Sequence, residues 1–427
     1  MRRATRSLIP EVLRVEPQFR LLFGGQVLSI VGDRVMLVAL PFAVLEAGGG
    51  LGAVGLVVAA QLVPFLVLAL VGGVLSDRGD RRRVLIGSDL ARLVVQATGG
   101  VLLVTDAATP VRLGVLAALY GSAEAFFQPA FTGLLPQTVS HPGQLQPANA
   151  LRGLSFSVAS IAGPALAGVL IAASGAGTAM LFDAASFAVS VVFLSRLAPI
   201  VAGVSVEEAP PPLMESLRGG WREIRTRRWI MAGLGAMACY HAIVLPAVYV
   251  LGPVTVSRDL GGPGAWAVVV VAFGVGAVLG DLLLLRIRPR LALRAAAIGL
   301  VVASLQAAVY GSGATLALMC ALQLVAGVGV TIFFTLWEVS LQEHVPGAAL
   351  SRVSSFDYVA AAGLMPLGTA LAGPIAAAVG AQETLLVMSA AGVACALAFL
   401  SVPEVRSLPR GPGASGQDQV AVSELVP

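Results

Sequence analysis

The stretch Gly73-Val-Leu-Ser-Asp-Arg-Gly-Asp-Arg-Arg-Arg-Val-Leu85 places two acids and four arginines between two long apolar runs. A small residue such as Gly73 lets two helices approach closely. Asp77, at a helix end, can cap backbone N–H groups or pair with arginine. A general excess of positive charge in inner loops explains the arginines at 81–83, but not Gly73 and Asp77 at this spacing. The stretch predicts a short charged turn between two membrane helices, able to latch one conformation.

The composition of the whole chain requires lipid as solvent. Apolar residues make up 57% of its 427 residues and charged residues only 12%, whereas a soluble domain has about 25% charged residues. The net charge of +4 fits basic loops facing an anionic leaflet, so we expect no nucleic acid partner.

The residue types present argue against an enzyme. All 27 basic residues are arginine, which excludes a Walker A, Schiff-base or kinase lysine. The three histidines are about a hundred residues apart, and the three cysteines each stand alone in an apolar run. This spacing indicates neither a zinc site nor a disulfide framework. We therefore expect no catalytic residues, no metal and no cofactor.

Twelve apolar runs are each long enough to cross a bilayer as a helix, which takes about 20 residues. They are continuous rather than alternating in polarity, which predicts helices and not the strands of a membrane barrel. The expected spans are residues 21–45, 54–75, 84–104, 113–135, 156–173, 180–197, 229–254, 266–285, 291–310, 316–337, 359–379 and 385–400.

The arginines predict the orientation of these spans. If the N-terminus is cytoplasmic, 23 arginines lie in inner segments and two, Arg112 and Arg258, lie in outer loops. Because arginine accumulates in cytoplasmic loops, we predict that both termini are cytoplasmic. The polar residues before the first span do not read as a cleavable signal, and the tail has the composition of a disordered segment.

The chain reads as two similar halves. Pro136 followed by Gly163-Pro164 recurs as Pro346 followed by Gly373-Pro374, with both offsets equal to 210 residues. Two similar halves with a site between them suit a rocking transporter.

We predict a cytoplasmic N-terminal segment (1–20), a six-helix bundle (21–197), a cytoplasmic linker with an amphipathic helix (198–228), a second six-helix bundle (229–403) and a disordered cytoplasmic tail (404–427). Leu217, Trp221 and Ile224 would form the apolar face of the linker helix, on the inner leaflet.

At these motifs the chain resembles the major facilitator superfamily. The cytoplasmic signature of that superfamily, Gly-x-Leu-Ala-Asp-Arg-x-Gly-Arg-Lys, is matched by Gly73, Leu75, Asp77, Arg78 and Arg81, with Asp80 in place of the second glycine. On the fifth span, Gly163, Pro164 and Gly168 resemble the Gly-Pro signature associated with exporters. The stretch Ala125-Phe-Phe-Gln-Pro129 and the pair Leu341-Gln342 resemble the enterobactin-exporter and macrolide-efflux branch of bacterial exporters.

The resemblance implies an all-α integral membrane protein with twelve transmembrane helices in two pseudo-symmetric six-helix bundles. It implies that the first, fourth, seventh and tenth spans line a central cavity, and that the protein sits in a bacterial plasma membrane. One feature departs from the related drug–proton antiporters, which often carry an arginine four residues before a glycine in the fourth span. Here Ala117 precedes Gly121 at that distance, so coupling through that arginine is not expected.

Ionisable groups inside lipid are costly, so each one is a functional candidate. Asp33 and Arg34 in the first span, Glu124 in the fourth and His241 in the seventh are our candidates for proton coupling or substrate contact. Asp33 and Arg34 cannot face one spot, since adjacent helical residues point about 100° apart. A lone intramembrane histidine such as His241 is more often a hydrogen-bonded packing residue. Asp183 is interpreted as structural, and Glu338 and Asp357 are expected to be hydrated or paired with Arg352.

We predict a secondary active exporter of lipophilic drugs or secondary metabolites, working by alternating access as a proton antiporter. Its partners would be a small lipophilic or cationic substrate, protons and membrane lipids, and it would act as a monomer. One alternative is a proton-coupled importer of a small nutrient, which would need more fixed hydrogen-bonding groups in its cavity. Another is a transporter-like receptor that moves nothing and need not keep the inner-loop motif.

Overall fold

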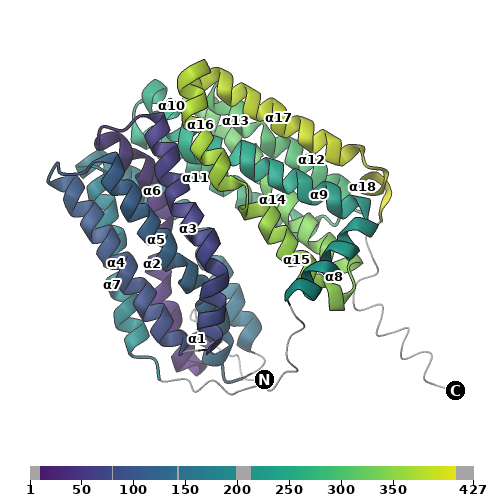
Figure 1. The fold of residues 1–427 in the computed structure, drawn as a ribbon, viewed down its shortest axis with the longest axis horizontal. Coiled ribbons are helices and arrows are strands. Elements are labelled where there is room, and N and C mark those ends of the chain that lie inside the picture. Colours follow the sequence, from purple (N-terminus) through teal and green to yellow (C-terminus); the bar gives the residue numbers. More distant parts are fainter. Residues whose placement is uncertain (1–9, 79, 142–143, 199–212, 410–427) are drawn as a thin grey trace, which may run out of the picture. The chain divides into compact units, whose positions relative to one another are not determined.

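The computed structural model describes residues 10–78, 80–141, 144–198 and 213–409. Within these ranges every regular element is helical, which confirms the all-α prediction (Figure 1). The chain divides into two compact units. The N-terminal unit consists of residues 1–205, 249–271 and 369–378, and the C-terminal unit consists of residues 206–248, 272–368 and 379–427. Residues 1–9 of the predicted N-terminal segment and residues 410–427 of the predicted tail lie outside the described residues.

Among the described residues, eight α-helices and one 3₁₀ helix lie entirely in the N-terminal unit. Its helices are α1 (Glu11–Val15), α2 (Pro17–Glu46), α3 (Leu51–Arg78), α4 (Arg81–Val104), α5 (Pro110–Leu134), the 3₁₀ helix η1 (Leu135–Thr138), α6 (Leu145–Ser174), α7 (Ala176–Ser195) and α10 (Gly252–Leu260). Helix α3 packs along α5, α4 packs on both α5 and α7, and α2 packs on α6 and α7 (Figure 1). Helices α2, α4, α5 and α7 therefore enclose a common interior.

The C-terminal unit contains the remaining helices. They are α8 (Leu213–Thr226), α9 (Arg228–Cys239), the π-helix η3 (Tyr240–Val244), α12 (Ala292–Ser304), α13 (Gln306–Tyr310), α14 (Leu316–His344), α15 (Gly347–Ala362), α17 (Ala381–Ser401) and α18 (Pro403–Ser407). Three helices, η4 (Ala247–Leu251), α11 (Pro263–Arg286) and α16 (Met365–Val379), have residues in both units. Helix α12 packs on α14 and α17, and α9 packs on α15 and α17.

Eleven of the twelve predicted spans correspond to helices that are long and apolar enough to cross a membrane. The exception is the fourth span, α5, which is 25 residues long but carries Tyr120, Glu124 and Gln128 among its apolar residues. These side chains lower its hydropathy, and Tyr120 is buried inside the N-terminal unit. A polar helix can persist in a bundle when its polar side chains face other helices, as Tyr120 does here.

Glycines with a left-handed backbone join the last two spans of each half. Gly175, with φ of 82°, separates α6 from α7, and Gly380, with φ of 105°, separates α16 from α17. Glycine adopts this conformation without the steric cost that a β-carbon adds. In the first of these turns the Glu46 carboxylate accepts the Ala176 backbone N–H at 3.0 Å. The same one-glycine turn at matching places supports the two-fold repeat in the sequence.

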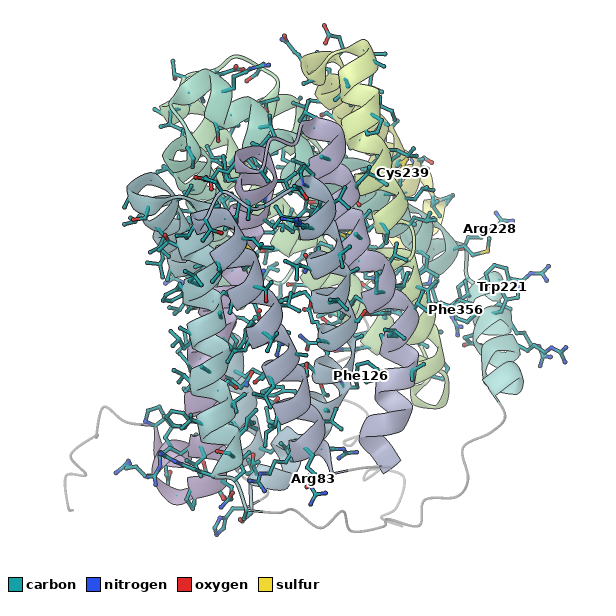
Figure 2. All side chains as sticks on the ribbon, turned by 60° about the vertical axis from the view of Figure 1, so that its left-hand side comes forward. Arg83, Phe126, Trp221, Arg228, Cys239 and Phe356 are labelled. Atoms are coloured by element: carbon teal, nitrogen blue, oxygen red, sulfur yellow. A yellow bond between two sulfur atoms is a disulfide. The ribbon has the colours of Figure 1, made fainter. Side chains whose placement is uncertain are left out.

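The amphipathic linker helix predicted from the sequence is α8. Ile224 is fully buried, and the ring of Trp221 lies 6.0 Å from that of Phe356 on α15 (Figure 2). Arg218, Arg222 and Arg225 are exposed. The side chain of Leu217 lies outside the described part of the chain. The described apolar side chains of α8 thus contact the C-terminal unit, while these arginines face outward; placement on the inner leaflet stays a prediction.

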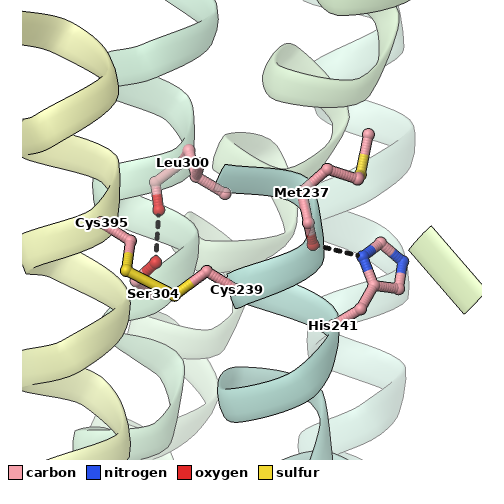
Figure 3. The surroundings of a disulfide bond; sticks show 6 residues. All are labelled: Met237, Cys239, His241, Leu300, Ser304 and Cys395. Atoms are coloured by element: carbon pink, nitrogen blue, oxygen red, sulfur yellow. Dashed lines mark hydrogen bonds between the residues drawn. A yellow bond between two sulfur atoms is a disulfide. The ribbon is translucent and has the colours of Figure 1, made fainter. Parts of the chain in front are cut away.

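The cysteines differ from the expectation. Cys239 at the end of α9 and Cys395 on α17 form a disulfide, with 6.7 Å between their Cα atoms (Figure 3). They are 156 residues apart in the chain, so nothing in their local spacing indicates the pairing. Only the packing of α9 against α17 brings them together. Cys320 is free.

A carboxylate fixes the start of the first long helix to a loop. Glu16, between α1 and α2, is 2% exposed and accepts the backbone N–H groups of Ser140 and His141, both at 3.0 Å. It also contacts His141 Nδ1 at 2.8 Å. The Ser140 N–H bond, with further help from His141, lowers the pKa of Glu16 from its ordinary value to about 2.

We predict that replacing Glu16 with glutamine destabilises the protein near neutral pH. A carboxyl whose pKa is lowered by folding stabilises the folded state above its ordinary pKa and stops doing so as it is protonated. The stability difference between wild type and Glu16→Gln should therefore shrink as the pH falls from 4.5 to about 2. Thermal melts of the detergent-solubilised chain between pH 7 and pH 2.5 measure this. Glu11→Gln, an exposed acid in α1, should show no such dependence, and a constant difference at all pH values would contradict the assignment.

Candidate functional site

Polar side chains from four helices meet in the interior of the N-terminal unit. They come from α2 (Gln26, Ser29, Asp33), α4 (Ser88, Asp89, Arg92, Gln96), α5 (Tyr120, Glu124) and α7 (Asp183, Ser186, Ser190). We call these residues the buried polar cluster. In an apolar solvent such groups are stable only when they satisfy one another.

Arg92 lies at the centre of the cluster. Its guanidinium carbon is 4.1 Å from the ring centre of Phe127 and 4.3 Å from that of Phe187. Its Nη2 contacts a carboxylate oxygen of Asp89, one helical turn earlier. The side chains of Arg92 and Asp89 are 2% and 0% exposed. Two aromatic faces and one carboxylate thus replace water around this cation.

Asp89 also accepts a hydrogen bond from another helix. The Ser190 hydroxyl on α7 donates to Asp89 Oδ2 at 2.6 Å, and Gln26 Nε2 on α2 donates to the Ser190 oxygen at 2.8 Å. This chain of hydrogen bonds joins three helices through one carboxylate. Both oxygens of Asp89 are therefore satisfied, which a buried charge requires.

Asp33 reaches the edge of the cluster. Its Oδ1 accepts the Tyr120 hydroxyl at 2.7 Å and lies 3.9 Å from Arg92 Nη1. Its side chain is 38% exposed, in contrast to that of Arg92. Asp33 is therefore the acid that connects Arg92 with the accessible surface of the unit.

Asp183 occupies the interior of the same cluster. Gln96 Nε2 donates to its Oδ2 at 2.6 Å, and the Ser186 hydroxyl lies 3.4 Å from its Oδ1. A β-carbon on Gly32 would lie 2.2 Å from Asp183 Oδ1. Gly32, next to Asp33, is therefore needed for α2 to pack over this carboxyl.

Glu124 lies on α5, one turn beyond Tyr120, and is half-buried. Gln61 on α3 hydrogen-bonds its carboxyl, and Asp33, Arg92 and Arg34 are within electrostatic reach. A β-carbon on Gly121 would lie 1.9 Å from the Gln61 carbonyl oxygen. That glycine lets α3 and α5 approach closely enough for Gln61 to meet Glu124.

Arg34 points away from Asp33, as the 100° rotation between neighbours predicts. Its guanidinium lies 5.8 Å from the Phe156 ring on α6. A β-carbon on Gly163 would lie 2.3 Å from the Arg34 β-carbon, and one on Gly168 would lie 2.6 Å from that of Ala267. With Pro164, which is buried inside α6, these glycines let α6 pack closely on α2 and on the start of α11.

The charged turn after α3 is described in part. The side chains of Asp77 and Arg78 and the surroundings of Gly73 lie outside what the structure describes. Arg81 Nη1 donates to the Gly133 carbonyl at 2.8 Å, and Arg82 Nε donates to the Leu194 carbonyl at 2.9 Å. Asp80 accepts the Arg82 N–H at 3.0 Å and so caps α4. The start of α4 is thus fastened to the ends of α5 and α7, with Asp80 serving the cap instead of the second signature glycine.

His241 lies in the C-terminal unit, on the π-helix that follows α9. Its Nδ1 donates to the Met237 carbonyl at 2.9 Å (Figure 3), and its ring packs edge-on against Phe334. This is the hydrogen-bonded packing role that a lone intramembrane histidine usually has. The contacts of His241 therefore give no support to a coupling role.

Sequence reasoning missed two central residues of the cluster, Asp89 and Arg92. The available signal was an acid and an arginine three residues apart within the third apolar run. Asp183, interpreted as structural, lies in the same cluster as the candidates Asp33 and Glu124. Among the described residues, no three His, Cys, Asp or Glu side chains gather in a way that could hold a metal ion.

Comparison with known proteins agrees with this architecture. The sequence profile of the transmembrane secretion effectors matches residues 13–417. The chain belongs to this family, within the major facilitator superfamily. The multidrug efflux pump Tap of Mycobacterium tuberculosis is 30% identical over 417 residues, covering 93% of this chain and 96% of Tap. Macrolide efflux protein A of Streptococcus pyogenes is 23% identical over 404 residues, covering 92% of this chain and 97% of that protein.

Solved structures support the fold. The crystal structure of the nucleoside transporter NupG aligns with a TM-score of 0.73 at 14% identity, over 90% of this chain and 98% of that one. The family match and the efflux-pump relatives identify this chain as a multi-pass membrane transporter and not an enzyme. Its twelve transmembrane helices form the two six-helix bundles of the superfamily.

We predict that Arg92→Met destabilises this transporter by about 3–5 kcal/mol, because it leaves the Asp89 carboxylate buried and unpaired. The double substitution Arg92→Met with Asp89→Asn should recover part of this loss, since neither charge is then left alone. Reversible unfolding in mixed detergent micelles measures both changes. Arg83→Met, whose arginine side chain is 86% exposed, is the control and should change stability by less than about 0.5 kcal/mol. Equal destabilisation by the single and double substitutions would refute the pairing.

Proposed function

We propose that this transporter exports lipophilic drugs or secondary metabolites in exchange for protons. The buried polar cluster is the observation that carries the coupling half of this proposal. The names of the relatives Tap and macrolide efflux protein A support the choice of drugs as cargo. The bias of arginine toward one set of loops supports cytoplasmic placement of both termini.

The charge balance of the cluster favours proton exchange. Four carboxyl groups, those of Asp33, Asp89, Glu124 and Asp183, interact with the guanidinium group of Arg92. Arg34 adds a second positive charge within reach of Asp33 and Glu124. Acids that outnumber cations in a dry site repel one another unless protons are bound. Such a cluster can take up a proton on one side of the membrane and release it on the other.

Asp33 and Glu124 are the acids best placed to exchange that proton. Both are only partly buried, whereas Asp89 and Asp183 are fully buried. Asp33 contacts both Tyr120 and Arg92, so a change in its charge alters hydrogen bonds on α5 and α4 together. We infer that Asp89 and Arg92 form the fixed ion pair against which these two acids titrate.

The missing arginine of the fourth span has a substitute in this arrangement. Related antiporters use that position, where this chain has Ala117. Arg92 brings a guanidinium to Tyr120 and Asp33 from the third span instead. The position of a charge inside the bundle matters more than the helix that carries it, because electrostatic coupling depends on distance and burial.

Alternating access would convert this proton exchange into transport. Two similar halves rock around a central site in transporters of this design. The turn containing Gly73, Asp77, Arg78 and Arg81 would latch one state, and the single chain would act as a monomer. A proton-coupled importer of a small nutrient could use the same acids, but the relatives Tap and macrolide efflux protein A favour export over import. A non-transporting receptor is less well supported, because it needs no cluster of buried acids.

Asp33→Asn and Glu124→Gln should each lower uphill transport at least tenfold. The test is the initial rate of drug uptake into inverted membrane vesicles under an imposed pH gradient. Exchange of one proton for one substrate molecule can drive about tenfold accumulation of the substrate for each pH unit of the gradient, since one pH unit corresponds to about 1.4 kcal/mol. Downhill exchange of substrate without a gradient should persist in both variants, because it needs no net proton movement.

Asp106→Asn is the matched control. Asp106 lies in an exposed loop with φ of 53°, a conformation that asparagine also tolerates. Gradient-driven uptake should match wild type in this variant. Wild-type uptake that ignores the pH gradient would reject proton exchange, and full gradient dependence in both acid variants would reject these residues as the coupling groups.

A further inference from the structure

A cavity of about 320 Å³ lies within the C-terminal unit, between α9, α14 and α15. Its walls include the rings of Phe334, Trp337 and Tyr358, the carboxyl groups of Glu338 and Asp357, and Met237. The volume falls near the lower end of the range for small-molecule sites, about 300–1,000 Å³. Nothing in the buried polar cluster contributes to it, since all of its lining belongs to the other unit.

The indole of Trp337 forms a rigid wall of the cavity. The side chain is 1% exposed and packs edge-on against Trp229 and Phe399. A β-carbon on Gly233 would lie 2.0 Å from the Trp337 ring, so α9 leaves the space that this ring occupies. A wall held from three sides keeps its shape before a ligand arrives, which limits the ordering cost of binding.

The same indole positions a carboxylate. Trp337 Nε1 donates to Asp357 Oδ1 at 2.8 Å. Glu338, the next residue on α14, lies within electrostatic reach of Asp357 and is exposed. Two acids thus border an aromatic cavity, and no basic side chain occurs in the lining that the structure describes.

We propose that this cavity binds a monovalent organic cation with apolar substituents. Aromatic faces attract cations through the ring quadrupole, and the attraction grows where water is excluded. The carboxylates of Asp357 and Glu338 supply the opposite charge, and Met237 offers an adaptable apolar surface. The inference rests on the proposed export function, for which it names the class of substrate.

The chemistry excludes other classes of ligand from this site. An anion would meet two carboxylates and no basic side chain in the lining that the structure describes. A neutral solute would leave the charges of Asp357 and Glu338 without a counter-charge, although Gln342 and Ser354 in the same lining could hydrogen-bond to it. A metal ion is disfavoured, because two carboxylates beside aromatic rings provide too few oxygen ligands for Ca²⁺ or Mg²⁺.

The experiment compares two ligands of nearly the same shape and different charge. Radiolabelled methyltriphenylphosphonium is a permanent cation, and triphenylphosphine oxide is its neutral counterpart. Equilibrium binding to the full-length detergent-solubilised chain should be strong for the cation and at least tenfold weaker for the neutral compound. Asp357→Asn and Glu338→Gln should each raise the Kd for the cation at least fivefold, and leave the Kd for the neutral compound within twofold of wild type.

Control substitutions test whether the loss of cation binding is specific to the acids of this cavity. Glu383→Gln, an exposed acid in the first turn of α17, should bind the cation like wild type. Asp106→Asn, which changes an exposed acid of the N-terminal unit, should also bind the cation like wild type. Trp337→Phe keeps an aromatic wall but loses the donor to Asp357, so it should weaken binding less than Asp357→Asn.

Two results would overturn the proposal. One is absence of cation binding to the wild-type protein. The other is an unchanged Kd in both Asp357→Asn and Glu338→Gln, with melting temperatures that match wild type. Failure of proton-driven uptake with cation binding intact would reject only the coupling proposal. The coupling proposal and the cation-binding proposal can therefore be tested independently.

Discussion

The enclosure of Arg92 is the constraint on which the N-terminal unit depends. A guanidinium in a lipid-embedded bundle cannot be left without partners, because no water is available to replace them. Phe127 on α5, Phe187 on α7 and Asp89 on α4 surround it. Three helices must therefore keep their relative positions for one charge to remain satisfied. The positions of the neighbouring acids depend on this packing around Arg92.

Glycines make that arrangement possible. Gly32 leaves space for the Asp183 carboxyl, and Gly121 lets α3 approach α5 at Gln61. In membranes the apolar surface of a helix gains little by leaving lipid, so close packing supplies much of the association energy. Small residues at these points bring polar groups within hydrogen-bonding distance. The same logic applies at Gly233, which accommodates Trp337 in the C-terminal unit.

The two acidic regions of the chain differ in their surroundings. In the N-terminal unit, carboxyl groups face a guanidinium and hydrogen-bond donors, which suits charge exchange within the bundle. In the C-terminal unit, Asp357 and Glu338 border a cavity with aromatic walls, which suits a bound cation. The separation explains how one protein could handle a proton and a cationic substrate without forcing both into a single site.

Composition and motifs that are local in the chain were enough to predict the membrane class, the helical spans and the family. Asp33 and Glu124 could be selected as candidates from the sequence, since an acid within an apolar run is conspicuous wherever the run packs. The partners of those acids were not predictable, because nothing local in the sequence placed Arg92 beside them, and the Cys239–Cys395 disulfide was unexpected. Which side chains meet depends on helix rotation and on the close approaches that single glycines allow. Only the tertiary structure decides those, because hydrogen bonds and ion pairs act over a few ångströms between residues far apart in the chain.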